Sequence, residues 1–342
     1  MAANMFLCIT VAMVFARCKS CSCGDSIYKK MTKRFFEIDF LKTVLMLGLV
    51  FRHAPLYLYS GTVKEYSIDN FDIFTAFIPV TSGFIFILGY TLGLSYVHKI
   101  KNNLDVSPNI RHLKMFLFLL SLSVLFASLT YFINKIDISF GSYYIGYIWN
   151  TANKPGFYIL LPISILFLIN YCQYFIKNRH FSGVLIVLCL FLINIVDLYV
   201  LHYLAFGLIG YFIGTILDFL KFKSRMSVTV FAFAIFLYIG PFLVDYNINF
   251  NFIVEVYYLL LFVIITIFLG KVSLFQGNII SNLIISTSRN ILPFYLIHVI
   301  GLNIIHNVVQ FDSFIGITAF SILYFIIIVY FISVTKVLFK NE

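Results

Sequence analysis

Apolar runs of about twenty residues alternate with short polar segments along most of the chain. A helix needs about twenty apolar residues to cross the hydrocarbon core of a bilayer. No internal repeat or low-complexity segment divides the series, so we expect one membrane domain at 37–342 after a leader or cytoplasmic segment at 1–36. The pattern predicts ten membrane-spanning helices, at 40–59, 74–97, 113–133, 156–176, 181–200, 202–220, 227–246, 252–270, 290–309 and 314–335.

The composition supports this interpretation. Of the 342 residues 61% are hydrophobic and only 11% are charged, whereas a soluble domain has about 25% charged residues. A mean hydropathy of +0.98 cannot be hidden in one water-soluble core. These values exclude a soluble enzyme, a disordered chain and a disulfide scaffold, and they predict an all-α polytopic helix bundle in the lipid bilayer.

The basic residues are divided unequally between the predicted loops. With a cytoplasmic N-terminus, 19 of the 24 Lys and Arg residues lie on the cytoplasmic side, three lie outside and two lie within the first span. Cytoplasmic loops of membrane proteins carry such an excess of Lys and Arg. We therefore expect both chain termini in the cytoplasm. Orientation in the membrane also explains the net charge of +10, so no nucleic-acid partner is expected.

The first thirty residues do not have the pattern of a secretory signal. Residues 5–15 are apolar and are followed by Arg17 and Lys19, whereas a signal peptide carries its positive charge before the apolar stretch. We expect the residues before Lys29 to be dispensable, with Met31 as an alternative start. Cys18, Cys21 and Cys23 have no second CxxC or histidine nearby, so no metal is expected.

A few ionisable residues lie deep inside predicted spans. Lys42, Arg52 and His53 lie in the first span and His298 in the ninth. Such residues are costly in a membrane and usually mark function. Lys42 and His53 are eleven residues apart, which on a helix is ~1100° and a rise of ~16 Å. They therefore share a face with a cation at the cytoplasmic mouth, which suits a long anionic ligand with a reactive end, such as coenzyme A.

Other interpretations of these residues stay open. Lys42 can extend to the interface, and His53 and His298 can be hydrogen-bonded packing residues. Arg52 cannot be neutralised and faces about 100° away from His53. It therefore needs a different partner, such as a carboxylate in an outer loop.

Four segments resemble the acyltransferase-3 family of membrane O-acyltransferases. Glu37-Ile-Asp39-Phe-Leu-Lys42, followed by Arg52-His53, is similar to its opening Ile-Asp-x-x-Arg/Lys pattern with a later His. Phe84-Ile-Phe-Ile-Leu-Gly89-Tyr90 resembles its Phe-Phe-x-x-Ser-Gly-Phe/Tyr segment, and Arg111-His-Leu-Lys114 resembles its Arg-x-x-Arg. Ser288-Arg-Asn-Ile-Leu-Pro-Phe-Tyr295-Leu-Ile-His298 is similar to the late Gly-x-x-Ser-Leu-x-x-Tyr-Leu-x-His segment.

The resemblance implies a multi-pass protein of the bacterial cytoplasmic membrane that transfers an acyl group, usually acetyl, from cytoplasmic acyl-CoA. The acceptor is usually a hydroxyl of a surface polysaccharide or lipid-linked glycan. His53 would be the catalytic histidine, with Lys42 and His298 beside it, and Lys42, Arg111 and Lys114 would face the phosphates of the donor. Arg52, Gly89 and Tyr295 are further candidate residues.

A second class of function is open on the sequence. A transporter for a small polar or anionic solute would also need ten spans with deep polar residues. The halves of the chain show no repeat, and their prolines are not placed symmetrically. A non-catalytic scaffold would not need Arg52 and His53 inside a span. The acceptor, the acyl chain and the oligomeric state are not determined by the sequence.

Overall fold

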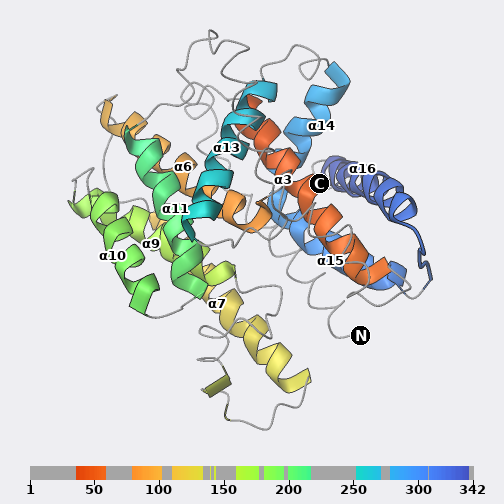
Figure 1. Cartoon of the computed structure of the whole chain (residues 1–342), viewed down its shortest axis with the longest axis horizontal. Helices are drawn as coiled ribbons and strands as arrows, with labels where there is room; N and C mark the ends of the chain where they lie inside the picture. Colours follow the sequence, from red (N-terminus) through yellow and green to blue (C-terminus); the bar gives the residue numbers. More distant parts are fainter. Residues whose placement is uncertain are drawn as a thin grey trace. The chain divides into compact units, whose positions relative to one another are not determined.

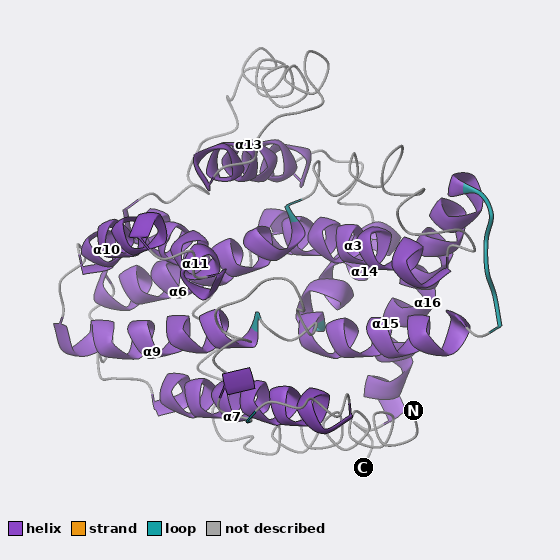
Figure 2. Ribbon diagram, turned by 60° about the horizontal axis from the view of Figure 1, so that its bottom comes forward, coloured by secondary structure: helices purple, strands orange, loops and turns teal. Residues whose placement is uncertain are grey.

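The structure is a computed structural model in which every described regular element is an α-helix (Figure 2). The fold class predicted from the sequence, all-α, is confirmed for this part of the chain. The residues that the structure describes are 36–58, 79–101, 110–133, 139, 142–143, 159–176, 181–195, 199–216, 252–270, 278–306 and 308–338.

The chain divides into two compact units. Unit 1 combines the two ends of the chain, Met1–Val80 and Leu261–Glu342, and unit 2 is the middle part, Thr81–Leu260. The helix α13 (Phe252–Gly270) contains the second boundary between them. The leader predicted at 1–36 lies outside the described residues except for Phe36.

Unit 1 is built around α3 (Phe36–Leu58). This helix packs against α14 (Asn278–Arg289), α15 (Ile291–His306) and α16 (Phe314–Leu338), which follow one another at the other end of the chain (Figure 1). The core between these helices is apolar and includes Leu45, Met46, Val50, Phe294 and Leu302. The histidines that the sequence singles out, on α3 and α15, therefore belong to neighbouring helices of one unit.

A break at Asn290 separates α14 from α15. The Asn290 N–H donates to the Thr287 carbonyl, and the next helix begins at Ile291. Pro293 lies in the first turn of α15, where a residue without an N–H is tolerated. The sequence predicted only the ninth span, 290–309. It missed α14, because polar residues interrupt the apolar positions of this short amphipathic helix.

Unit 2 contains α6 (Val80–Lys101), α7 (Ile110–Ile133), α9 (Leu160–Ile176), α10 (Phe181–Ile195) and α11 (Tyr199–Ile216). The helix α9 packs against both α7 and α11, and α11 also packs against α10 (Figure 1).

Glycines allow α6 and α11 to approach backbone to backbone. A Cβ at Gly89 would overlap the Gly207 carbonyl oxygen, and one at Gly93 would overlap that of Tyr211. The relationship is mutual, since a Cβ at Gly210 would overlap the Phe86 carbonyl. Small residues at such spacing are typical of helix pairs in membranes. Gly89, a candidate site residue from the sequence, therefore has a packing role here.

Two helices among the described residues are long and apolar enough to cross a membrane, Val80–Ile100 and Ile315–Ile332. Shorter apolar helices are Leu160–Ile176, Phe181–Leu192, Val200–Thr215 and Val254–Gly270. Each predicted span that falls within the described residues overlaps a helix. The span predicted at 227–246 lies outside them.

Candidate functional site

Two histidines on neighbouring helices of unit 1 form a hydrogen-bonded pair. His53 Nδ1, on α3, lies 2.8 Å from His298 Nε2, on α15. The two residues are 245 positions apart in sequence. The packing of α15 on α3 brings the two histidines together.

The two imidazole rings lie edge to edge in one plane. Their planes are inclined by only 8° and their centroids are 5.1 Å apart. Rings stacked face to face keep their atoms at least about 3.5 Å apart, whereas these rings have two nitrogens at 2.8 Å. The nitrogens therefore meet in the ring plane, which is the geometry of an N–H···N hydrogen bond.

The backbone decides which nitrogens carry the protons. His298 Nδ1 lies 3.2 Å from the Phe294 carbonyl oxygen, and a carbonyl can only accept, so Nδ1 carries the hydrogen. In neutral His298 the Nε2 atom is then an acceptor, and His53 Nδ1 donates to it. Neutral His53 is left with a lone pair on Nε2. That atom can accept a proton, and the hydrogen bond at Nδ1 orients it.

The surroundings of His298 hold its ring in place. His298 is fully buried, and its own carbonyl oxygen accepts a 2.7 Å hydrogen bond from the Tyr324 hydroxyl of α16. The Phe294 ring lies 5.9 Å from the imidazole, inclined by 26°. A Cβ at Gly301 would overlap the Tyr324 hydroxyl, so the glycine makes room for this bond. His298 is thus a fixed partner, while His53 is half-buried.

A buried carboxylate anchors the start of α3 to the last turn of α14. The Ser288 hydroxyl donates to Asp39 Oδ1 at 2.5 Å, the short distance typical of a bond to a charged oxygen. One turn along α3, the Thr43 hydroxyl lies 3.1 Å from the Ile284 carbonyl oxygen. Asp39 and Ser288 belong to the segments that resemble the family, but the sequence did not predict their contact.

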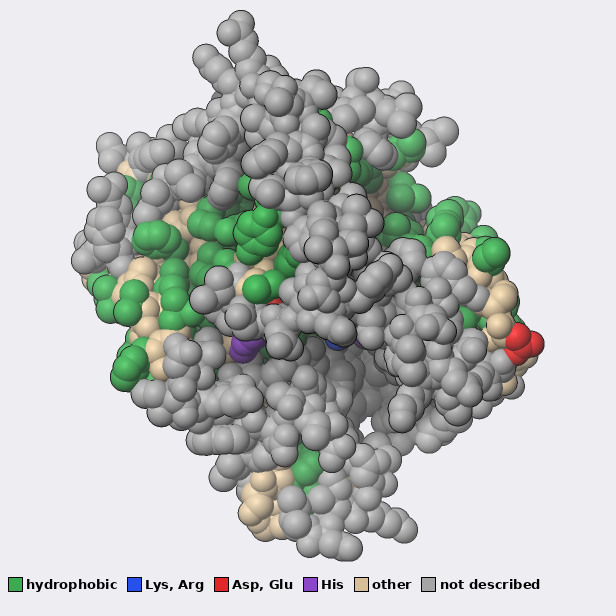
Figure 3. Space-filling model, in the orientation of Figure 1, with side chains coloured by type: hydrophobic (Ala, Val, Ile, Leu, Met, Phe, Trp, Pro, Cys, Tyr) green, Lys and Arg blue, Asp and Glu red, His purple; other side chains and the backbone are tan. Residues whose placement is uncertain are grey.

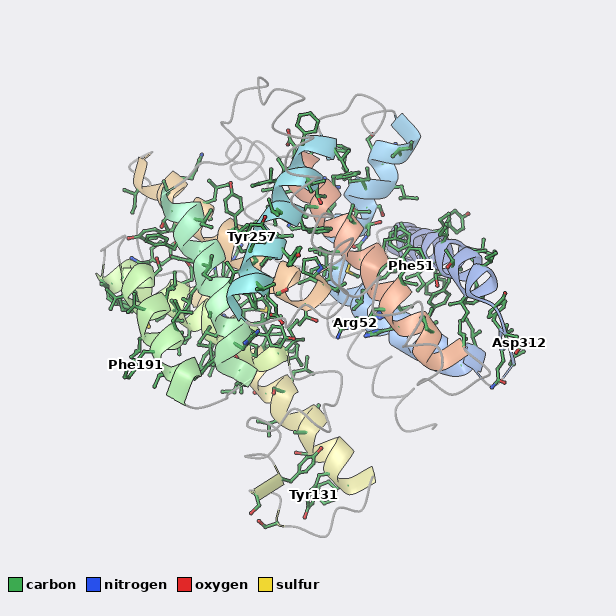
Figure 4. All side chains as sticks on the ribbon, viewed as in Figure 1. Phe51, Arg52, Tyr131, Phe191, Tyr257 and Asp312 are labelled. Carbon is green, nitrogen blue, oxygen red and sulfur yellow. The ribbon has the colours of Figure 1, made fainter. Side chains whose placement is uncertain are left out.

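The remaining candidates on α3 are Lys42 and Arg52. Lys42 is half-buried three residues after Asp39. Arg52 is also half-buried, and Figure 4 draws it on the side of α3 opposite Phe51, which lies on the α16 side. Among the described carboxylates none is within ion-pair distance of Arg52, so the outer-loop partner expected from the sequence stays a prediction.

The other predicted site residues are distributed between the units. Arg111 and Lys114 lie exposed in the first two turns of α7, in unit 2, whereas Lys42 belongs to unit 1. Tyr295 is part of α15, but its side chain lies outside the described set. Among the described residues no group of three or more His, Cys, Asp or Glu side chains could hold a metal ion. Cys18, Cys21 and Cys23 fall outside them.

Comparison with family models, with curated proteins and with solved structures finds no match for this chain. The resemblance to acyltransferase-3 proteins therefore depends on the quoted segments, and the functional argument depends on the geometry of the site.

Proposed function

We propose that this chain is a membrane acyltransferase that moves an acyl group from cytoplasmic acyl-CoA to a hydroxyl group of a glycan. The observation that carries the proposal is the in-plane hydrogen bond between His53 and His298. This hydrogen bond orients His53 as a base on α3, the helix whose first two turns contain the Asp39-x-x-Lys42 pattern.

The proposed protein has ten spans, and its exposed apolar faces support this. Val184, Val187, Leu188 and Phe191 form a stripe along α10, and each is at least half exposed. Figure 4 shows Phe191 at the outer side of that helix, and hydrophobic side chains dominate the coloured surface in Figure 3. Ile322, Ile326 and other large residues are exposed along α16. Apolar stripes of this extent suit lipid rather than water.

Contacts between helix ends agree with the proposed topology. Leu58 at the predicted outer end of α3 accepts a 2.8 Å bond from Phe311 in a predicted outer segment. His202 and Glu255, 2.8 Å apart, begin two helices that both enter from outside in the ten-span order. In each contact both partners lie on the same predicted side of the membrane.

The histidine pair can perform the chemistry of acyl transfer. His53 Nε2 removes the proton of the acceptor hydroxyl as its oxygen attacks the thioester carbonyl. The C–S bond then breaks, and the thiolate of CoA leaves and receives a proton from the imidazolium. The hydrogen bond from His53 Nδ1 to His298 Nε2 spreads the positive charge while His53 is protonated. No metal or redox group is required for this balance.

The donor would be bound from the cytoplasmic side. Lys42 lies eleven residues before His53 on the same face of α3, about the length of an extended pantetheine arm in axial rise, ~16 Å. Lys42 would interact with the phosphates of the donor through charge-assisted hydrogen bonds.

Acyl transfer in membranes tests the proposal directly. Membranes that contain the full chain would be incubated with radiolabelled acetyl-CoA and a lipid-linked glycan fraction. We expect His53→Ala to lower the transfer rate by roughly 10²- to 10⁴-fold, the contribution of a general base, with little change in protein level. His98→Ala, at an exposed histidine of α6, is the matched control.

Wild-type transfer by His53→Ala would refute the catalytic role. If no transfer occurs in the wild type but a solute gradient depends on His53, the chain is a transporter instead. A comparison of the glycans of cells with and without this chain would then show no difference in acylation.

A further inference from the structure

A buried polar network connects three helices of unit 2. The Tyr211 hydroxyl, on α11, donates to Asn170 Oδ1, on α9, at 3.0 Å. The Asn170 amide nitrogen lies 2.8 Å from His112 Nδ1, on α7. Asn170 and Tyr211 are at most 1% exposed. Buried polar groups are costly unless they are hydrogen-bonded, so these bonds fix the position of the His112 ring.

The network also selects the tautomer of His112. Because Asn170 Oδ1 accepts from Tyr211, the Asn170 amide nitrogen is the donor and His112 Nδ1 is the acceptor. His112 lies in the first turn of α7, before the predicted span at 113–133. Burial, and next the charge of Lys99, lower its pKa to about 4. At neutral pH it is therefore uncharged, with its hydrogen on Nε2 directed away from Asn170.

The ammonium group of Lys99 lies against the same aromatic group as His112. Lys99 Nζ, near the end of α6, lies 5.0 Å from the centroid of the Tyr174 ring. That ring is 6.3 Å from the ring of His112 and packs edge-on against Tyr96. Tyr174 is 1% exposed, so the aromatic group is a rigid support that limits where the ammonium group can be.

We propose that Lys99 and His112 together bind one phosphate group of a cytoplasmic ligand, which under the proposed function is a phosphate of acyl-CoA. An ammonium and a neutral imidazole N–H both donate to a ligand, and phosphate oxygens only accept. The site differs from the Arg111 and Lys114 pair, because on a helix residue 112 faces about 100° away from residue 111. His112 faces α9, whereas Arg111 and Lys114 are exposed.

Binding of CoA to the purified full chain in detergent tests this site with a matched pair of variants. His112→Asn keeps an acceptor toward Asn170 but removes the distal donor, and we expect a loss of affinity of about tenfold or more, the effect of one charge-assisted hydrogen bond. His112→Gln places an amide N–H near the position of Nε2 and should retain most of the affinity. Lys99→Met should weaken binding as much as His112→Asn does, and His98→Asn is the control.

Two further measurements show whether the bound phosphate belongs to acyl-CoA or to a lipid headgroup. If it belongs to acyl-CoA, dephospho-CoA or inorganic pyrophosphate should compete, and binding of CoA should not depend on anionic lipid in nanodiscs. If the phosphate belongs to a lipid headgroup, anionic nanodiscs should lower the CoA affinity of the wild type to that of Lys99→Met and should not lower that of Lys99→Met further. Equal CoA affinity of wild type, His112→Asn and Lys99→Met overturns the site.

The outcome of the CoA-binding experiment can be distinguished from the outcome of the acyl-transfer experiment. CoA binding that depends on His112, with no transfer activity, supports this site and rejects the enzyme. Transfer that depends on His53, with CoA affinity unchanged in His112→Asn and Lys99→Met, supports the enzyme and rejects this site.

Discussion

The Asp39 carboxylate and the Ser288 hydroxyl, 2.5 Å apart, join α3 to the last turn of α14, the helix that precedes α15. Further along α3, His53 makes a hydrogen bond to His298 of α15, the helix that follows α14. The carboxylate contact therefore constrains where α15 begins along α3, and through this register it supports the alignment of the two imidazoles. The carboxylate is nearly buried, with 6% exposure.

Removal of the Ser288 hydroxyl should destabilise unit 1. Ser288→Ala leaves a buried carboxylate without this donor, which costs roughly 1.5–3 kcal/mol. Thermal unfolding of the chain in detergent measures the loss. In the double variant with Asp39→Asn, the two effects should be clearly less than additive. Ser121→Ala, which removes an exposed hydroxyl bonded within its own helix, should have little effect.

The effect of substituting His298 should depend on the replacement. His298→Ala removes the acceptor for His53 Nδ1 and should lower kcat by roughly tenfold to a hundredfold, less than loss of the base itself. His298→Gln offers an amide oxygen to His53 and should recover part of the rate. The pH dependence of kcat should shift in His298→Ala but not in the control His98→Ala. Equal rates for both His298 variants would contradict an orienting role.

Larger side chains in place of the glycines at the contact between α6 and α11 should destabilise unit 2. Gly210→Leu would place atoms against the Phe86 carbonyl, and overpacking of this kind costs about 1–3 kcal/mol. The yield of monodisperse protein in size-exclusion chromatography and the melting temperature should both fall. Gly183→Ala is the matched control, because its Cβ would meet only the edge of the Phe212 ring at 3.0 Å. A neutral Gly210→Leu would show that the backbones do not touch.

Accessibility of single cysteines can test the topology. Asp312 is exposed between α15 and α16 (Figure 4), on the predicted outer side. Arg289 is exposed at the end of α14, on the predicted cytoplasmic side. In a cysteine-free background, an impermeant maleimide should label D312C in intact cells and R289C only after lysis. Reporter fusions at Ser224 and Asn247, outside the described residues, should likewise give opposite locations. Equal labelling would contradict ten spans.

The depressed pKa of His112 predicts the pH dependence of stability. Its pKa is lowered from 6.5 to about 4 in the folded chain, so between these values the unfolded chain binds more protons. The His112 contribution to stability is therefore present above about pH 6.5 and is lost as the pH falls toward 4. Melting temperatures at pH 7.5 and 5 should differ more in the wild type than in His112→Asn. The same difference in both would show that His112 does not titrate in this way.

The sequence by itself determined the helical class and most helix positions. Apolar runs of a fixed length leave few alternatives, because every backbone polar group in lipid must be bonded within its own segment. The predicted spans at 252–270 and 314–335 begin at the same residues as α13 and α16. The sequence also placed Lys42 and His53 on a common face of one helix, because the angle between two residues of a helix follows from its geometry alone.

Only the tertiary structure brought His298 to His53 and selected its tautomer. Sequence spacing says nothing about which helices become neighbours, and a histidine within an apolar run is as compatible with packing as with catalysis. The network of His112, Asn170 and Tyr211 was not predicted for the same reason. Hydrogen bonds between helices depend on how α15 packs on α3 and α9 on α7, and that packing is decided by the whole apolar surface of each helix rather than by the polar residues it brings together.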